Sequence, residues 1–299
     1  MLIKNIKLWD DNDYVKVEGY ILENSMEFQA NKKKPAIIIC PGGAYLGTSD
    51  REAEPVAMRF AAEGYHTFVL RYNTYFTEWI SDFNNLPKPN EKSTYPAPLF
   101  DLAKAMITIK ENAESWFVDT EKIYLCGFSA GAHLAASMGV HWKDDLLRDK
   151  FQVESEMFKC NSIILGYPLL DYEVMKEKLE ESSDKMLRGL FEISNKAVFG
   201  KVEPTDEELK KLSPVNYVSK NTPPIFIWHT ANDGLVYVEN SLRLATKLTK
   251  NKIPYELHIF EDGPHGLSLC DETTAGEKTH INPHCSAWFH MAVEFIKKH

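Results

Sequence analysis

The stretch KIYLCGFSAGAHLAASMGVH, residues 122–141, combines an apolar run, a serine between two glycines, and a second run of small and apolar side chains. The first five residues are typical of a buried strand, and residues 130–141 are typical of a packed helix. Between them, GFSAG at 127–131 matches the G-x-S-x-G pattern of a sharp strand-to-helix turn. Glycines two positions either side of the serine remove the Cβ atoms that would collide across that turn. The pattern predicts that Ser129 is an exposed nucleophile.

A simpler interpretation of the same stretch is a glycine-rich packing turn with an incidental serine. The strand before it and the helix after it favour the nucleophile. The N–H of Ala130, at the helix N-terminus, is then available to a developing oxyanion. His133 lies one helical turn further on, and we interpret it as a packed histidine rather than the base of the serine.

Apolar runs of strand length alternate with helical patterns along the rest of the chain. Strands are expected at 36–40, 66–72, 122–126, 162–168, 225–230 and 255–260, and helices near 52–63, 97–113, 130–141, 237–250 and 285–298. Strands that are apolar throughout and separated by helices indicate an α/β fold with a mostly parallel central sheet and helices on both faces. Residues 14–22 alternate apolar with polar and predict an antiparallel edge strand.

The length of 299 residues and the hydrophobic content of 44% fit a single domain spanning residues 1–299. Two stretches interrupt the alternation of strands and helices. Residues 73–95 are rich in aromatic residues, Asn and Pro, and residues 172–221 carry charged helical patterns. Both follow strands, so we expect them to form a lid or cap at the sheet edge where α/β folds build ligand sites.

Composition also limits the partners. A net charge of −9 argues against nucleic acid. No segment reaches the roughly 18 apolar residues of a membrane span, and the N-terminus lacks a signal-peptide pattern. The five cysteines have neither disulfide-scaffold nor zinc-site spacing. We expect a cytoplasmic protein without a cofactor, and the sequence leaves open whether it forms a homo-oligomer.

A second glycine-containing motif follows the strand at 36–40. The sequence CPGGAY, residues 40–45, occupies the place of the HGGG-type loop that supplies oxyanion N–H groups in this motif set. Gly42 and Gly43 permit close approach of the backbone to a ligand, although an ordinary strand-to-helix turn is the alternative.

The nucleophile turn predicts an acid and then a histidine after later strands. Asp233 follows the strand at 225–230, and His265 follows the strand at 255–260. The order Ser129, Asp233, His265 is that of a Ser-His-Asp triad on an α/β-hydrolase sheet. Asp171 also follows a strand and is the competing acid.

Other histidines have less specific surroundings. His229, at the end of a strand, is expected to be a strand-end hydrogen-bonding group. His280, His284, Cys285 and His290 cluster in sequence, but a proline separates the first two, so we expect a loop entering the last helix and no metal site.

As a set, these motifs resemble the α/β-hydrolase esterases related to acetyl-xylan esterases, a group also described as lipase/esterase or acetylhydrolase. The resemblance is carried by CPGGAY, by residues 95–136 around GFSAG, by ANDGLVYVENSLRLATKL and by GPHGLSL, in the order of the family. It implies that Ser129 is the nucleophile, Asp233 the acid and His265 the base. It also implies an oxyanion hole formed by Gly43, Ala44 and Ala130.

The resemblance implies a small-molecule ester substrate with a short acyl group, acetyl foremost, on a sugar. Pro41 and Ala44 depart from the His and third glycine of related loops, so the acyl pocket is expected to differ. Tyr45, Tyr75 and Trp79 are candidates for stacking against the substrate, or alternatively for packing the lid. An arylformamidase, a peptidase with the same triad and a catalytically silent binding protein remain alternatives.

Overall fold

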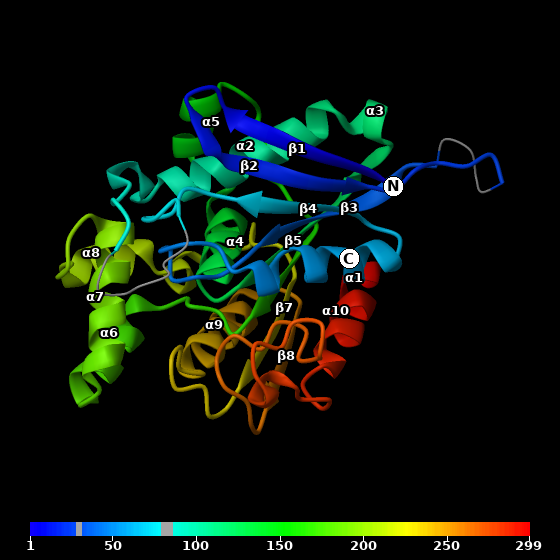
Figure 1. Cartoon of the computed structure of the whole chain (residues 1–299). Helices are drawn as coiled ribbons and strands as arrows, with labels where there is room; N and C mark the ends of the chain where they lie inside the picture. Colours follow the sequence, from blue (N-terminus) through cyan, green and yellow to red (C-terminus); the bar gives the residue numbers. More distant parts are fainter. Residues whose placement is uncertain (28–31, 79–85) are drawn as a thin grey trace.

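A computed structural model describes residues 1–27, 32–78 and 86–299 of the chain and has one eight-stranded sheet at its centre (Figure 1). The strand order is β1-β2-β4-β3-β5-β6-β7-β8. The strands are β1 Leu2–Trp9, β2 Asn12–Ile21, β3 Lys34–Cys40, β4 His66–Arg71, β5 Val118–Phe128, β6 Ser162–Gly166, β7 Ile225–Thr230 and β8 Tyr255–Phe260. The six strands from β3 to β8 are parallel, whereas β2 is antiparallel to both β1 and β4.

The sheet is buried on both faces because its parallel strands are apolar at successive positions. In β3, Ile38 and Cys40 point into one core, and Ile37 and Ile39 point into the other. The first core is covered by α2 Ala97–Glu111, α4 Ala130–His141 and α9 Glu239–Asn251. The second core is covered by α1 Glu54–Ala62 and α10 Ala287–Lys298, which Figure 1 places together on the opposite face. The predicted α/β class is therefore confirmed.

The two N-terminal strands differ from the sequence prediction. Residues 14–22 form an antiparallel strand as expected, but this strand, β2, lies between β1 and β4 rather than at the edge. The edge strand is β1, which the sequence did not predict. Its burial explains why, because only Leu8 among its eight residues is buried and the apolar periodicity is correspondingly weak.

Three helices gather beside the carboxyl end of the sheet. They are α6 Tyr172–Glu181, α7 Lys185–Phe199 and α8 Asp206–Leu212, and Figure 1 shows them together on the side toward which β4 points. The remaining short helices are α3 Ala113–Trp116 and α5 Asp145–Phe151. In the described part of 73–95, the N–H groups of Tyr75 and Phe76 donate to Tyr45 and Leu46. No helix within the described residues is long and apolar enough to span a bilayer.

Candidate active site

The turn between β5 and α4 has the strained geometry that the sequence motif requires. Ser129 has φ 52° and ψ −117°, a conformation that side-chain-bearing residues rarely adopt. A Cβ on Gly131 would lie 2.0 Å from the carbonyl oxygen of Cys40, and one on Gly127 would lie 2.4 Å from that of Gly131. Neither glycine therefore tolerates a side chain. The absence of side chains at these two positions lets the backbone turn sharply enough to present Ser129 at the carboxyl edge of the sheet.

The structure brings the three predicted triad residues together from loops after three different strands. Ser129 Oγ lies 2.8 Å from His265 Nε2, and His265 Nδ1 lies 2.7 Å from Asp233 Oδ2. A carboxylate only accepts hydrogen bonds, so the network assigns the proton to Nδ1 of His265. Nε2 then carries a free lone pair and accepts the hydroxyl proton of Ser129. This is the arrangement that general-base activation of a serine needs.

The carboxylate of Asp233 is fixed next to His265 by burial and by hydrogen bonds. Its Oδ1 accepts the N–H groups of Leu235 and Val236 at 2.9 and 3.0 Å, and the residue is only 4% exposed. Burial opposes ionisation, but the charge of His265 and hydrogen bonds from His229 and His265 outweigh it and lower the pKa of Asp233. Asp233 is therefore ionised at neutral pH, and its carboxylate is placed to orient His265.

His229 supports this acid from the end of β7. Its Nε2 lies 2.8 Å from the carbonyl oxygen of Val236, which fixes the proton on Nε2, and 3.2 Å from Asp233 Oδ2. Its Nδ1 lies 2.8 Å from Ser241 Oγ. The expected strand-end role of His229 thus extends to a contact with the acid.

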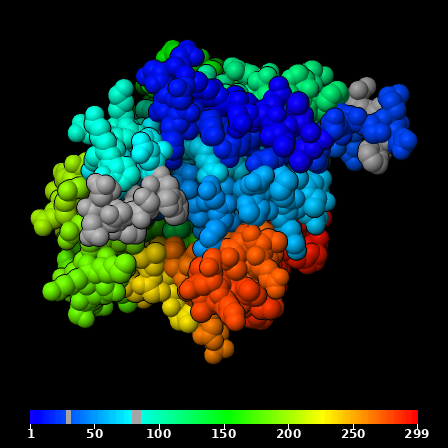
Figure 2. Space-filling view, in the orientation of Figure 1, coloured from blue at the N-terminus to red at the C-terminus, as the bar shows by residue number. Residues whose placement is uncertain are grey.

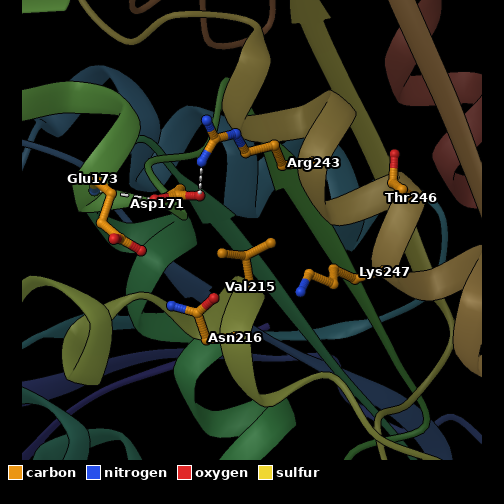
Figure 3. A pocket seen from close by; sticks show the side chains of 7 residues that line it. All are labelled: Asp171, Glu173, Val215, Asn216, Arg243, Thr246 and Lys247. Carbon is orange, nitrogen blue, oxygen red and sulfur yellow. Dashed lines mark hydrogen bonds and ion pairs between the residues drawn. The ribbon is translucent and has the colours of Figure 1, made fainter. Parts of the chain in front are cut away.

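Asp171 has other partners. Its Oδ1 accepts the N–H groups of Glu173 and Val174 and so caps α6, while Oδ2 pairs with Arg243 at 3.0 Å. It lines a separate surface pocket of about 200 Å³, whose other residues are Glu173, Val215, Asn216, Arg243, Thr246 and Lys247 (Figure 3). The geometry therefore favours Asp233 over Asp171 as the acid.

The loop after β3 turns its backbone toward Ser129. A Cβ on Gly42 would lie 2.9 Å from Ser129 Cβ, so the two residues are in direct contact. The N–H of Gly42 donates to Glu52 Oε2 at 2.7 Å. Gly43 has φ 130° and Ala44 has φ 55°, both in the region of positive φ. Because Gly42 has this other partner, Gly43 and Ala44 are the better candidates in this loop for donors to an oxyanion, together with Ala130 at the start of α4.

The three residues predicted to stack against substrate differ in their surroundings. Tyr45 is only 2% exposed, and its hydroxyl lies 2.6 Å from His133 Nδ1, so its ring lies in the core and is unavailable for stacking. Its place in sequence, next to the proposed oxyanion donors, predicts an open tyrosine, but the ring instead packs edge-on against His133. Tyr75 is half-buried and packs edge-on against Phe76. Trp79 lies outside the described residues.

His133 is a packed histidine, as predicted. It is fully buried, and its Nε2 lies 2.7 Å from the carbonyl oxygen of Leu212, the last residue of α8. Burial lowers the pKa of His133 to about 4, so the ring is neutral and accepts the hydroxyl of Tyr45. His133 thereby connects α4, the loop after β3 and the C-terminal end of α8.

Two buried side chains that the sequence did not single out, Glu52 and Tyr167, are hydrogen-bonded to each other beside the proposed triad. Glu52 is 4% exposed, and Tyr167, directly after β6, is 2% exposed. The ring of Tyr167 packs edge-on against His265 with centroids 4.9 Å apart. The position of Tyr167 at a strand end is a signal that sequence analysis could have used, whereas nothing in the sequence pairs Glu52 with it.

A parallel sheet with the serine after β5, the acid after β7 and the histidine after β8 defines an α/β hydrolase. The chain belongs to the BD-FAE family, which it matches over residues 25–248. The resemblance to α/β-hydrolase esterases is therefore confirmed. In the described residues, no group of three or more His, Cys, Asp or Glu side chains is placed to hold a metal ion.

Proteins similar to this chain include esterases and a xylanase. Carboxylesterase Cest-2923 from Lactobacillus plantarum WCFS1 superposes with a TM-score of 0.81 at 26% identity, covering 100% of this chain and 98% of that one. The acetyl ester-xyloside bifunctional hydrolase from Caldicellulosiruptor lactoaceticus is 31% identical, with a TM-score of 0.70 over 97% of this chain and 96% of that one. Endo-1,4-beta-xylanase B from Butyrivibrio fibrisolvens is 31% identical over 89% of this chain, which spans 38% of that protein's length.

Proposed function

We propose that this protein is a serine esterase that hydrolyses short-chain acyl esters, acetyl foremost, carried by a carbohydrate. The observation that carries the proposal is the continuous chain of hydrogen bonds from Ser129 through His265 to Asp233. The names of two relatives support the carbohydrate, because one is an acetyl ester-xyloside hydrolase and another is a xylanase.

The proposed reaction proceeds in two halves. Ser129 Oγ attacks the ester carbonyl while His265 Nε2 takes the hydroxyl proton, and the N–H groups of Gly43, Ala44 and Ala130 receive the oxyanion. The tetrahedral intermediate then collapses, the protonated His265 gives its proton to the departing alcohol, and the acyl group stays on Ser129. In the second half, His265 takes a proton from water as the water attacks the acyl-enzyme. The new tetrahedral intermediate then collapses, His265 returns the proton to the departing Ser129 Oγ, and the carboxylic acid leaves.

Crowding around the loop after β3 supports a short acyl group. Helix α7 packs on this loop, with Ser194 Oγ donating to the carbonyl oxygen of Ala44 at 2.9 Å. Gly42 contacts Ser129 directly on the other side. The ring of Tyr45 packs in the core against Tyr72 and His133, so the short-acyl proposal rests on the backbone of this loop and on α7.

The acyl preference is tested with p-nitrophenyl esters of increasing chain length. We expect kcat/KM to be highest for acetate and to fall beyond about four carbons, with each misfit methylene costing about 1 kcal/mol or more through overpacking. Acetate released from acetylated xylo-oligosaccharides tests the carbohydrate part of the proposal. A higher kcat/KM for p-nitrophenyl octanoate than for the acetate would refute the short-acyl preference.

A further inference from the structure

Glu52 is a buried carboxylate that the triad chemistry does not use directly. It closes the short helix Asp50–Glu52 after the loop that follows β3. One of its oxygens, Oε2, accepts the N–H of Gly42 at 2.7 Å, and Gly42 in turn contacts Ser129. Glu52 therefore fixes Gly42, the residue before the proposed oxyanion donor Gly43, against Ser129.

The other oxygen of Glu52 connects to the histidine loop. Tyr167 donates its hydroxyl proton to Glu52 Oε1 at 2.6 Å. The same hydroxyl accepts the N–H of Ser268, three residues after His265, at 3.0 Å, and Ser268 Oγ donates to the carbonyl oxygen of Arg51. Figure 2 shows these two segments, blue near residue 50 and orange near 265, in contact on one face. One carboxylate thus links both sides of the triad.

The directions of these hydrogen bonds require an acceptor at position 52. Because Ser268 donates to the Tyr167 oxygen, the proton of Tyr167 points to Glu52, and Gly42 also donates to it. Burial raises the pKa of Glu52, while the hydrogen bonds from Tyr167 and Gly42 and the charge of His265 oppose that rise. A buried acid of this kind is costly to the fold, so its presence calls for a role beyond packing.

We propose that Glu52 is a positioning residue that sets the oxyanion loop and His265 in register with Ser129, with Tyr167 as its connection to the histidine loop. The proposal rests on the proposed serine-hydrolase function. Because catalysis depends on placement to within a fraction of an ångström, loosening this link lowers the chemical rate more than it lowers substrate binding.

Two substitutions break the link at different atoms. Glu52→Gln supplies one oxygen for Gly42 but presents an amide N–H₂ to Tyr167, which leaves the Tyr167 hydroxyl proton without an acceptor. Tyr167→Phe keeps the carboxylate and removes the connection to Ser268. Tyr172→Phe is the matched control, because Tyr172 is also a buried tyrosine and its hydroxyl has no hydrogen-bond partner among the described residues.

The measurement is kcat and KM on p-nitrophenyl acetate together with the melting temperature. We expect Glu52→Gln and Tyr167→Phe each to lower kcat by about 10- to 100-fold, with KM changed by less than about threefold. The double variant is expected to match the slower single variant, because both changes break one network. Glu52→Gln is expected to shift Tm by no more than about 3 °C, since relief of the buried charge offsets the lost hydrogen bond.

Other outcomes would overturn the proposal. These are an unchanged kcat in both single variants, a change confined to KM, or kcat losses that multiply in the double variant. If Glu52→Gln does not fold, the proposal is tested by comparing kcat of Tyr167→Phe with kcat of the control Tyr172→Phe. If even the wild type hydrolyses no ester, the proposed function fails, and the rate of Ser129 phosphorylation by diethyl p-nitrophenyl phosphate tests the link alone. An equal rate in wild type and Tyr167→Phe would then overturn it.

Discussion

Replacement of Ser129 by alanine is expected to lower kcat on p-nitrophenyl acetate by about 10⁴-fold or more. The hydroxyl of Ser129 lies 2.8 Å from His265 Nε2 and is the proposed nucleophile, so its loss would leave only oxyanion stabilisation and binding. Alanine retains the Cβ and requires no new space. The unfolding temperature is therefore expected to stay close to that of the wild type, and activity and thermal unfolding are measured on the same preparation.

Ser162→Ala is the matched control for this substitution. Ser162 is fully buried at the start of β6, and its hydroxyl has no hydrogen-bond partner among the described residues. Removing an unpaired buried hydroxyl is expected to leave kcat unchanged. Turnover by Ser129→Ala within about tenfold of the wild type would exclude the proposed mechanism, since triad nucleophiles contribute far more than this.

Asp233→Asn is expected to lower kcat by about 10³- to 10⁴-fold, the second largest effect. An amide side chain can present its N–H₂ group to His265 Nδ1, which moves the imidazole proton to Nε2. Nε2 then no longer accepts the proton of Ser129. Steady-state kinetics on p-nitrophenyl acetate measures the loss, and circular dichroism checks that the fold is kept.

Asp171→Asn separates this effect from the general cost of removing a buried carboxylate. Asp171 is 3% exposed and Asp233 is 4% exposed, so the two sites are similarly buried. Asparagine still caps a helix N-terminus, and the ion pair that is lost reaches a half-exposed Arg243. We expect a change in kcat of less than about threefold, consistent with a surface ion pair. A larger loss for Asp171→Asn than for Asp233→Asn would move the acid to the earlier strand.

The sequence predicts the central sheet well because its strands are buried on both faces. The strands at 225–230 and 255–260 and the helix at 130–141 have the predicted bounds. Continuous apolar runs and small residues at tight contacts are local properties, and the sequence displays them directly. The edge strand β1 has neither property, and it forms through pairing with β2.

The proposed triad can also be predicted from the sequence, because each of its three residues occupies a fixed place after a strand. Glu52 is different, since its two partners lie 10 and 115 residues away and no motif connects them. The sequence also fails to predict where the side chain of Tyr45 lies. Its neighbour in sequence is a proposed oxyanion donor, yet its ring lies in the core and its hydroxyl contacts His133. Such contacts depend on tertiary structure and not on local pattern.

The central claim, that His265 activates Ser129 as a nucleophile, is tested most directly by labelling with diethyl p-nitrophenyl phosphate. The reagent transfers its phosphoryl group to an activated serine and releases p-nitrophenolate. We predict that peptide mass spectrometry finds a single adduct, on Ser129, and that His265→Ala slows its formation by about 10³-fold or more. An adduct on another residue, or equally fast labelling of Ser129 in His265→Ala, would contradict the account.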